Sequence, residues 1–369
     1  MALSKKRVLV GMSGGVDSSV AAALLKDQGY EVIGITITSV KIDDNCKPDT
    51  RETGCCNYQA IMDAMDICTK LGIEHHLIDL SEIFKEKIIS NFIDEYMSGR
   101  TPNPCTLCNP LIKWGEVLKK ADEYDCYYYA TGHYANISHD SESDRYYIKA
   151  GDDEMKDQSY FLWGLSQSQL SRTLFPLANL VKTETRSIAE QYGITVYNKV
   201  DSQEICFVPS DDYKDFLIKN VVNIESNYNH GDILFRGVVI GKHRGYPFYT
   251  IGQRKGLGVS HSQPIYVKDI VPETNTIVVD IEEAILSRKF IAKNINLMKY
   301  STLPEEKLFD VKIRYRDKGN KATCRINGNN DLEIEFLEPR KAITPGQSVV
   351  VYEGADLVCG AVIESVVSQ

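Results

Sequence analysis

A glycine-rich loop near the start of the chain has the residue types that bind phosphate groups. It follows an apolar run at residues 7–10 and reads Gly11-Met12-Ser13-Gly14-Gly15-Val16-Asp17-Ser18-Ser19. A strand, a glycine turn and a helix start together aim backbone N–H groups and the positive end of the helix dipole at one point. Gly14 and Gly15 let the backbone come close to an anion, and the serines add hydroxyl donors. This stretch therefore predicts an anion cradle.

The loop is neither GxxxxGK[ST] nor GxGxxG, because it has no lysine at its end and a different glycine spacing. It resembles the SGGxDS loop of the ATP pyrophosphatases, which cut ATP between the α and β phosphates and adenylate a substrate. An ordinary glycine turn is the alternative, but the complete motif favours a nucleotide. We expect ATP with Mg²⁺ near Asp17, which would hold the ion or orient the turn. The predicted ATP-binding residues are Gly11, Met12, Ser13, Gly14, Gly15, Val16, Asp17 and Ser18.

A second candidate site is the pair Cys105 and Cys108, in the stretch Thr101-Pro102-Asn103-Pro104-Cys105-Thr106-Leu107-Cys108-Asn109-Pro110. The three prolines predict an extended, stiff backbone that holds side chains in place. Such a pair is half of a zinc site, a thioredoxin-like dithiol, or a nucleophile that awaits a distant cysteine. No second pair has zinc-site spacing, and prolines stand where a thioredoxin motif follows a strand. Cys206 is a candidate for the distant cysteine.

Strand-like and helix-like segments alternate in the first half of the chain. We predict strands at residues 7–10, 31–38, 76–80 and 126–131, and helices at residues 20–25, 61–71, 83–99 and 111–124. This alternation predicts a parallel sheet with helices on both faces. Ligands of such sheets bind where the strands end, so the glycine loop is well placed.

The second half of the chain is predicted to be mostly antiparallel β. Beyond residues 211–229, short alternating runs lie at residues 233–235, 238–240, 265–267, 276–279, 311–316, 332–336 and 348–352. The fold class is therefore α/β. We expect an N-terminal doubly wound parallel sheet of the ATP pyrophosphatase type in residues 1–212. A small, mostly-β central domain follows in residues 213–283, and a C-terminal antiparallel β-barrel in residues 284–369.

Composition narrows the class of protein. The chain of 369 residues is 43% hydrophobic and 25% charged, as in globular proteins, with no apolar run of membrane-spanning length and no secretory start. We expect a cytoplasmic protein without a membrane partner, whose ten cysteines are thiols or ligands rather than a disulfide framework.

The net charge of −9 argues against a nucleic-acid partner, but residues 233–268 hold six basic and no acidic residues. Aromatic residues interleave them at Tyr246, Phe248, Tyr249 and Tyr266. A solvated sheet face is the ordinary explanation of this stretch, and an RNA-binding surface is the alternative.

Eight segments, in the same order, resemble the tRNA-specific 2-thiouridylases, which replace O2 of the wobble uridine with sulfur. They lie at residues 11–19, 101–113, 130–134, 156–162, 201–207, 249–256, 313–316 and 345–348. The resemblance implies that ATP adenylates O2 and that Cys206 carries a persulfide from a sulfur-relay protein or a cysteine desulfurase. Cys108 would be the second thiol and would end in a disulfide with Cys206.

The same resemblance implies roles for other residues. Ile37 and Gly132 would line the adenine pocket, and Asn103, Pro104 and Cys105 would contact the target base. Contacts with tRNA would come from His133, Lys156, Asp157, Gln158, Arg314, Tyr315 and Gln347. Each set has an ordinary alternative, such as a core histidine, a polar loop or an exposed β face.

The chain departs from the family pattern at two positions. Cys105 stands where an aspartate is usual, which puts a general-base role there in doubt, and Pro110 stands where a lysine is usual. The substitution at Cys105 suggests a further hypothesis, in which Cys105, Cys108 and Cys206 together hold an iron–sulfur cluster with one open iron.

Two other functions remain open from the sequence. One is an amide-forming ATP pyrophosphatase that acts on a small molecule, as in the GMP or NAD synthetase group, but it has no use for the paired cysteines. The other is a non-catalytic tRNA-binding protein with a vestigial nucleotide loop, in which Asp17 would be dispensable.

Overall fold

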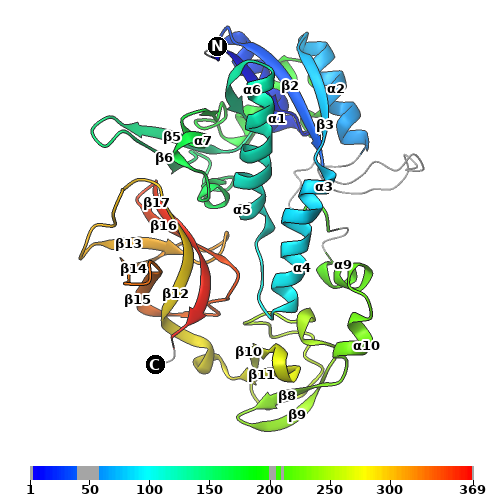
Figure 1. Ribbon diagram of the computed structural model, residues 1–369, viewed down its shortest axis with the longest axis vertical. Coiled ribbons are helices and arrows are strands. Elements are labelled where there is room, and N and C mark those ends of the chain that lie inside the picture. The colour runs from blue at the N-terminus through cyan, green and yellow to red at the C-terminus, as the bar shows by residue number, and fades with distance from the viewer. Residues whose placement is uncertain (1–2, 40–57, 199–204, 209–211, 368–369) are drawn as a thin grey trace. The chain divides into compact units, whose positions relative to one another are not determined.

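The computed structural model describes residues 3–39, 58–198, 205–208 and 212–367 (Figure 1). The chain forms two compact units. The first comprises residues 1–88, 105–211 and 355–357, and the second comprises residues 89–104, 212–354 and 358–369. Residues 89–104, which lie inside the expected N-terminal domain, thus pack with the second unit.

The first unit contains the expected parallel sheet. Its strands, in spatial order, are β3 (Glu74–Asp79), β2 (Glu31–Thr38), β1 (Ser4–Gly11), β4 (Cys126–Ala130) and β7 (Thr173–Leu174), and every neighbouring pair is parallel. Val10 in β1 lies between Gly34 of β2 and Ala130 of β4. The loops that follow these three strands therefore emerge at one edge of the sheet.

Burial on both faces explains why this sheet is doubly wound. Val8 and Val10 cluster with residues of α1 (Val16–Asp27) and α2 (Tyr58–Leu71). Leu9 points to the opposite face, since side chains alternate along a strand, and it is also fully buried. This unit also contains α3 (Ser81–Phe84), α6 (Val117–Glu123), α7 (Gln167–Leu170), α8 (Lys182–Gln191) and the antiparallel hairpin of β5 (Ala135–Asp140) and β6 (Arg145–Ala150).

The proline-rich stretch is less extended than predicted. A helix, α5 (Pro104–Cys108), begins inside it and continues through a π-helical segment, Asn109–Glu116, into α6. Proline is tolerated in the first turn of a helix, because its missing N–H has no partner there in any case. Only residues 101–103 lack regular structure, so the prediction of an extended stretch through residue 110 was wrong.

The second unit contains α4 (Ser90–Met97), α9 (Tyr213–Asn220) and α10 (Ile224–Tyr228), together with two β structures. A four-stranded sheet has the order β10 (Tyr266–Val271), β11 (Thr276–Asp280), β8 (Gly231–Phe235) and β9 (Val238–His243). The barrel has the order β12 (Leu286–Leu297), β15 (Leu332–Lys341), β14 (Asn320–Ile326), β13 (Leu308–Lys312), β16 (Ser348–Glu353) and β17 (Asp356–Val366). It closes where β12 pairs with β17. The predicted antiparallel barrel is confirmed.

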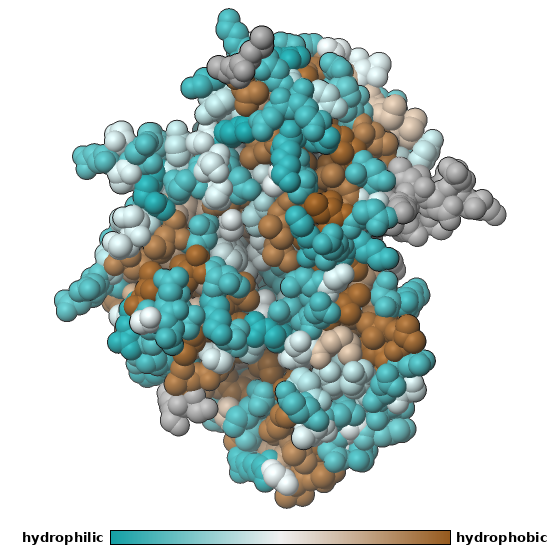
Figure 2. Space-filling view, in the orientation of Figure 1, coloured by the Kyte–Doolittle hydropathy of each residue, from teal (hydrophilic) through white to brown (hydrophobic). Residues whose placement is uncertain are grey.

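Hydrophilic and hydrophobic side chains are interspersed on the face shown in Figure 2. One hydrophobic patch lies over α9 and α10, where Ile218 and Val222 are exposed. Among the described residues, no helix combines the length and the apolar composition that a membrane span needs.

The basic stretch at residues 233–268 does not form an aromatic surface. Tyr246, Phe248, Tyr249 and Tyr266 are all buried, at 3–7% exposed. Because these rings are buried, they are not available to stack on bases.

Candidate active site

The glycine loop joins β1 to α1 and is held by its own serines. Ser13 N–H donates to Ser18 Oγ at 3.1 Å, and Ser18 Oγ donates to the Gly15 carbonyl at 3.2 Å. Ser19 Oγ donates to the same carbonyl at 2.7 Å. These bonds fold the loop back over the first turn of α1, so that its backbone is already ordered before an anion binds.

Two glycines of the site are required by close packing. Gly14 has φ +67°, and a Cβ there would lie 2.1 Å from the Ala60 carbonyl oxygen. Gly132, just beyond β4, passes over the start of α1, and a Cβ on it would lie 2.6 Å from Ser18 N. The structure therefore brings Gly132, expected near adenine, against the glycine loop.

Asp17 is held by two residues that the sequence did not point to. Lys182 Nζ, at the start of α8, lies 2.8 Å from both carboxylate oxygens of Asp17. The Tyr134 hydroxyl lies 2.9 Å from Asp17 Oδ1 and 2.9 Å from Thr185 Oγ1. Lys182 is only 8% exposed. The sequence does not reveal this role, because the same residues would be expected around an exposed lysine in the first turn of a helix.

The β2 edge of the site holds Ile37. It is half-buried, pairs in register with Ile78 of β3, and precedes Thr38, the last residue of β2. Met12 N–H donates to the Ile35 carbonyl at 2.7 Å, which ties the glycine loop to the same strand. Ile37 thus lies near the end of a strand adjacent to the loop, in keeping with an apolar wall for a flat ring.

Cys108 lies on α5, in the same unit as the glycine loop. Cys105 is exposed and Cys108 buried on α5, one helical turn apart. Burial raises the pKa of Tyr129 in β4, Lys113 lowers it, and the neighbouring Cys108 raises it further. The Tyr129 hydroxyl reaches within 2.7 Å of where a Cβ on Gly11 would stand. Tyr129 thus lies against the end of β1, and the electrostatic surroundings of its hydroxyl include Cys108.

Asn109 anchors the same helix. Its side chain is 1% exposed, and Nδ2 donates to the Phe161 carbonyl at 2.8 Å. This bond anchors the residue that follows Cys108. Asn103 and Pro104, expected to contact the target base, lie immediately before Cys105, at the point where α5 begins.

Cys206 lies in a short described segment, residues 205–208. Its side chain is half-buried and is a thiol, as are those of Cys105 and Cys108. The next residue, Phe207, packs edge-to-face on Phe84 of α3 with ring centroids 5.6 Å apart. The structure thus fixes Cys206 beside α3, whereas Cys108 lies on α5.

His133 is held among aromatic rings. Nδ1 lies 2.7 Å from Thr131 Oγ1, and the ring lies 5.6 Å from Trp114 and 6.1 Å from Phe175. Burial lowers the pKa of His133 well below its ordinary value, and the charge of Lys113 lowers it further. The imidazole is therefore neutral near pH 7. This environment agrees with the alternative of a core histidine at a strand end.

The Lys156-Asp157-Gln158 loop uses two of its side chains internally. Asp157 is 9% exposed and accepts from the backbone N–H of Gly151 and of Ser159. Gln158 Oε1 accepts from Tyr134 N–H at 3.0 Å. Lys156 is half-buried. Asp157 and Gln158 therefore shape the loop itself, which the sequence did not reveal.

Arg314 and Tyr315 lie in a turn beyond β13. The strand predicted at residues 311–316 ends at Lys312, so its last four residues were assigned wrongly. The turn folds around Asp317, whose carboxylate accepts from Gly319 N–H at 3.2 Å and from Arg340 Nη2 at 3.1 Å. Arg314 and Tyr315 are exposed on this turn, as an RNA contact requires.

The side chain of Gln347 forms hydrogen bonds with main-chain carbonyls of its own unit. Its Nε2 donates to the carbonyls of Thr101 and Pro102, at 3.0 and 3.2 Å. The residue expected to contact tRNA thus bonds the proline-rich stretch.

No group of three or more His, Cys, Asp or Glu side chains in the described residues is arranged to hold a metal ion. Cys105, Cys108 and Cys206 all belong to the described part, so in this conformation they do not form a ligand set for an iron–sulfur cluster. Asp17, the expected Mg²⁺ residue, directs both carboxylate oxygens to Lys182.

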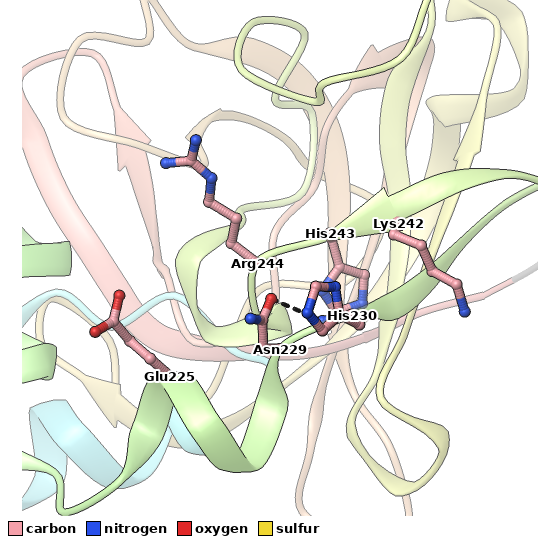
Figure 3. A pocket seen from close by; sticks show the side chains of 6 residues that line it. All are labelled: Glu225, Asn229, His230, Lys242, His243 and Arg244. Carbon is pink, nitrogen blue, oxygen red and sulfur yellow. Dashed lines mark hydrogen bonds between the residues drawn. The ribbon is translucent and has the colours of Figure 1, made fainter.

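A polar pocket of about 430 Å³ lies in the second unit, and Figure 3 shows its lining: Glu225, Asn229, His230, Lys242, His243 and Arg244. His243 is fixed, since Nδ1 accepts from Gly245 N–H and Nε2 donates to the Asn275 carbonyl, both at 3.0 Å. Burial lowers the pKa of His243, which keeps it neutral. Lys242 pairs with Asp232 at 2.6 Å, which offsets its charge. These six lining residues include no cysteine, serine or threonine, so the pocket offers no thiol or hydroxyl nucleophile.

Comparison with known proteins points to one family. Family models match residues 6–210 as a tRNA methyl transferase HUP domain, residues 217–280 as a tRNA methyl transferase PRC-barrel domain, and residues 287–363 as an aminomethyltransferase beta-barrel domain. The chain is 47% identical to the tRNA-specific 2-thiouridylase MnmA of Salinibacter ruber, over 99% of this chain and 96% of that protein. It is 46% identical to the tRNA-specific 2-thiouridylase MnmA of Cytophaga hutchinsonii, over the full length of both.

A solved structure of a 4-thiouridine synthetase–RNA complex with bound ATP is similar over 59% of this chain and 50% of that chain. Its identity is 18% and its TM-score 0.35, a likeness too weak to support a conclusion.

Proposed function

This chain belongs to the family of tRNA-specific 2-thiouridylases, and we propose that it is an ATP-dependent sulfurtransferase that converts the wobble uridine of tRNA anticodons to 2-thiouridine. The products would be 2-thiouridine, AMP and pyrophosphate. The observation that supports this most directly is that the glycine loop and the two cysteine-bearing segments, residues 105–108 and 205–208, belong to one compact unit. A nucleotide loop and sulfur nucleophiles thus occur in the same unit.

The first step we propose is adenylation. O2 of the uridine attacks the α-phosphate of ATP, and pyrophosphate leaves, so that a poor leaving group at C2 becomes AMP. The preordered loop and the N-terminus of α1 suit the phosphates, and Ile37 and Gly132 would flank the adenine. The uridine must leave the anticodon stack, which costs less for an unpaired base than for a paired one.

The second step we propose is sulfur transfer. The terminal sulfur of a Cys206 persulfide attacks C2 and displaces AMP, giving a Cys206–S–S–C2 adduct. The Cys108 thiolate then attacks Sγ of Cys206, which forms a Cys108–Cys206 disulfide and leaves the outer sulfur and its electron pair on the base as the thione. An external thiol reductant restores both cysteines. In the alternative order, Cys108 first frees hydrosulfide, which then attacks C2.

The metal proposals differ in their support. The geometry does not favour Asp17 as a direct Mg²⁺ ligand, because Lys182 occupies both of its oxygens; Mg²⁺ would therefore arrive on the phosphates of ATP. The three cysteines do not fit an iron–sulfur cluster in this conformation, and no step above uses one. Absorbance near about 400 nm together with bound iron in an anaerobic preparation would restore the cluster hypothesis.

The remaining assignments are proposals of the same kind. Adenylation and sulfur transfer would belong to residues 1–212, and tRNA contacts to residues 213–283 and 284–369, with Arg314 and Tyr315 exposed in the last of these. The persulfide would come from a sulfur-relay protein or a cysteine desulfurase. A cytoplasmic location stays a prediction.

The test is thiolation of an unmodified tRNA transcript with a wobble uridine, given ATP, Mg²⁺ and a persulfide or sulfide donor. A mercury-containing gel retards thiolated tRNA. We expect retardation only when both ATP and the wobble uridine are present, and a transcript with cytidine at that position is the matched control.

The same assay separates the competing functions. AMP release with a small-molecule acceptor and no tRNA would indicate an amide-forming synthetase. Binding of tRNA without AMP release, unaffected by Asp17→Ala, would indicate a non-catalytic tRNA-binding protein. Neither is favoured by the family to which the chain belongs.

A further inference from the structure

The peptide unit that joins Met12 to Ser13, at the start of the glycine loop, is held on both sides. Its carbonyl, that of Met12, accepts from Thr36 Oγ1 of β2 at 2.8 Å. Its N–H, that of Ser13, donates to Ser18 Oγ of α1 at 3.1 Å. Met12 N–H also donates to the Ile35 carbonyl of β2 at 2.7 Å. These bonds fix the plane of the first peptide of the loop.

His75 of β3 lies behind the Thr36 hydroxyl, with Nε2 2.8 Å from Thr36 Oγ1. The Met12 carbonyl cannot donate, so the single hydroxyl proton of Thr36 belongs to the bond with Met12. Thr36 Oγ1 therefore accepts from a proton on His75 Nε2, and the network assigns the tautomer of the ring. Burial lowers the pKa of His75 and the neighbouring His76 lowers it further, so the ring is neutral near pH 7.

These groups occupy a closely packed place on one face of the sheet. Thr36 and Met12 are each only 2% exposed. His75 pairs in register with Gly34 of β2, which leaves the space that its neighbours fill. A Cβ on Gly34 would lie 2.8 Å from Cys68 Sγ, 3.2 Å from Met12 Cγ and 3.3 Å from His75 Cδ2. The Met12 carbonyl is thus poorly exposed to solvent and depends on Thr36 for its hydrogen bond.

The direction of this first peptide matters for the rest of the loop. Backbone N–H groups of a strand–loop–helix turn bind phosphates only when their peptide planes aim them at one point. Thr36 also precedes Ile37, the expected wall for adenine, on β2. One strand therefore both holds the phosphate loop and carries the residue that would flank the base.

We propose that Thr36, supported by His75, is a positioning residue for the triphosphate of ATP, an inference that rests on the proposed function. Thr36 acts through the peptide between Met12 and Ser13 and not by touching the nucleotide. Without its hydroxyl, the Met12 carbonyl becomes a poorly solvated acceptor with no partner, which favours rotation of the peptide. Such a rotation withdraws Ser13 N–H from Ser18 and turns the following N–H groups away from the phosphates.

The decisive variant is Thr36→Val, which keeps the shape of the side chain and removes the hydroxyl. We expect Kd for ATP, measured by calorimetry, to rise about 10-fold, as for a buried acceptor that loses its partner. Kd for pyrophosphate should rise by a similar factor, because the loop binds phosphates. In the thiolation assay, KM for ATP should rise with kcat unchanged, since the loop holds the phosphates in the ground state and the transition state alike. Thr36→Ser should restore both constants.

Thr38→Val is the matched control. Thr38 lies two residues further along β2 and is 3% exposed, so the substitution and the degree of burial are the same. Its Oγ1 donates to Asp79 Oδ1 of β3, at 3.3 Å, rather than to the glycine loop. This variant should leave Kd for ATP and Kd for pyrophosphate unchanged.

Two variants of His75 test its supporting role. His75→Leu should raise Kd for ATP about threefold, less than Thr36→Val, because the Thr36 hydroxyl loses a polarising partner but still bonds Met12. His75→Gln, which keeps a donor at a similar reach, should bind ATP as the wild type does. The double variant Thr36→Val with His75→Leu should bind ATP no more weakly than Thr36→Val alone, since His75 acts through the hydroxyl. If Thr36→Val does not fold, the His75 variants still decide the question.

Three results would overturn the inference. One is an unchanged Kd for ATP in Thr36→Val. Another is weaker ATP binding with unchanged pyrophosphate binding, which would place the effect at Ile37 and not at the loop. The third is a fall in kcat with KM for ATP unchanged, as expected if the variant only lowers the fraction of folded protein. The titrations need neither tRNA nor a sulfur donor, so a wild-type protein that binds ATP and thiolates nothing would refute the proposed function alone.

Discussion

Lys182 and Asp17 form a partly buried ion pair across 165 positions of sequence, with Nζ 2.8 Å from each carboxylate oxygen. The lysine side chain is 10% exposed and the aspartate 30%. Asp17 belongs to the glycine-loop motif and Lys182 to the first turn of α8. The ion pair therefore ties the carboxylate of the glycine-loop motif to a helix from a distant part of the chain. The positive charge of Lys182 offsets the negative charge of Asp17.

The variant Lys182→Met should lower the free energy of unfolding by about 1–3 kcal/mol, because it leaves the Asp17 charge in a poorly solvated place. AMP release should fall with it, since the loop loses its support. The double variant Asp17→Asn with Lys182→Met should recover most of the stability but not AMP release. Urea unfolding and an AMP assay check both. Equal stability of the single and double variants would contradict the pairing.

Gly14→Ala should abolish ATP use and destabilise the protein by more than about 2 kcal/mol, because its Cβ would enter the Ala60 carbonyl. Gly29→Ala is the matched control: it also has positive φ, +84°, but nothing lies within 4 Å of the added Cβ. The control should cost only the backbone strain, about 1–2 kcal/mol, with ATP binding intact. ATP titration by calorimetry measures the difference. Similar losses in both variants would show that steric clash is not the cause.

The variants Cys206→Ser and Cys108→Ser should both lose thiolation, by at least about 100-fold, since a hydroxyl neither carries a persulfide nor exchanges with one. The two variants should differ in whether sulfur from the donor stays bound to the protein. With a ³⁵S-labelled donor, Cys108→Ser should hold label on the protein, whereas Cys206→Ser should hold none. Release of pyrophosphate from ATP, which precedes sulfur transfer, should persist in both variants. Full thiolation by Cys206→Ser would refute its role as the carrier.

Because of Glu353, at the end of β16, the stability of the barrel should depend on pH in the acidic range. Hydrogen bonds from Lys307, Tyr300 and Lys299 lower the pKa of Glu353 from 4.5 to about 2. The unfolded carboxyl binds a proton first, so this contribution is complete above about pH 4.5 and is lost as pH falls toward about 2. Glu353→Gln should cost about 1 kcal/mol at pH 7, a value reduced for partial exposure, and only a small part of that at pH 2.

Unfolding midpoints of wild type and Glu353→Gln across this pH range provide the check. Glu338→Gln is the control, because the Glu338 side chain is 85% exposed and lies 4.0 Å from Arg288. A difference between wild type and Glu353→Gln that persists unchanged at pH 2 would count against the assignment.

Arg314→Ala should weaken the binding of all tRNA sequences to the same extent. It should also reduce the slope of log affinity against log salt concentration by about 1, as expected for one lost phosphate contact. The exposed turn leaves the fold unaffected by this change. Arg288→Ala, on β12 of the same barrel, is the comparison variant. Filter binding between low and physiological salt measures both, and equal slopes for Arg314→Ala and wild type would remove Arg314 from the interface.

The sequence by itself determined the features that depend on neighbouring residues. Gly14, Gly15 and the serines of the loop are contiguous, so their chemistry can be read without a fold. The alternation of strand and helix patterns likewise predicted the parallel sheet, and the short alternating runs predicted the barrel. In each case, local periodicity and local hydrogen bonding carry the information.

Only the tertiary structure decided what depends on packing between distant segments. The sequence did not mark Lys182 as the partner of Asp17, and it gave no sign that the Gln347 amide bonds the Thr101 and Pro102 carbonyls. It read Tyr246 and its aromatic neighbours as surface, whereas they are core. A side chain's partner is set by which surfaces meet when the chain collapses, and one sequence records the composition of those surfaces but not their pairing.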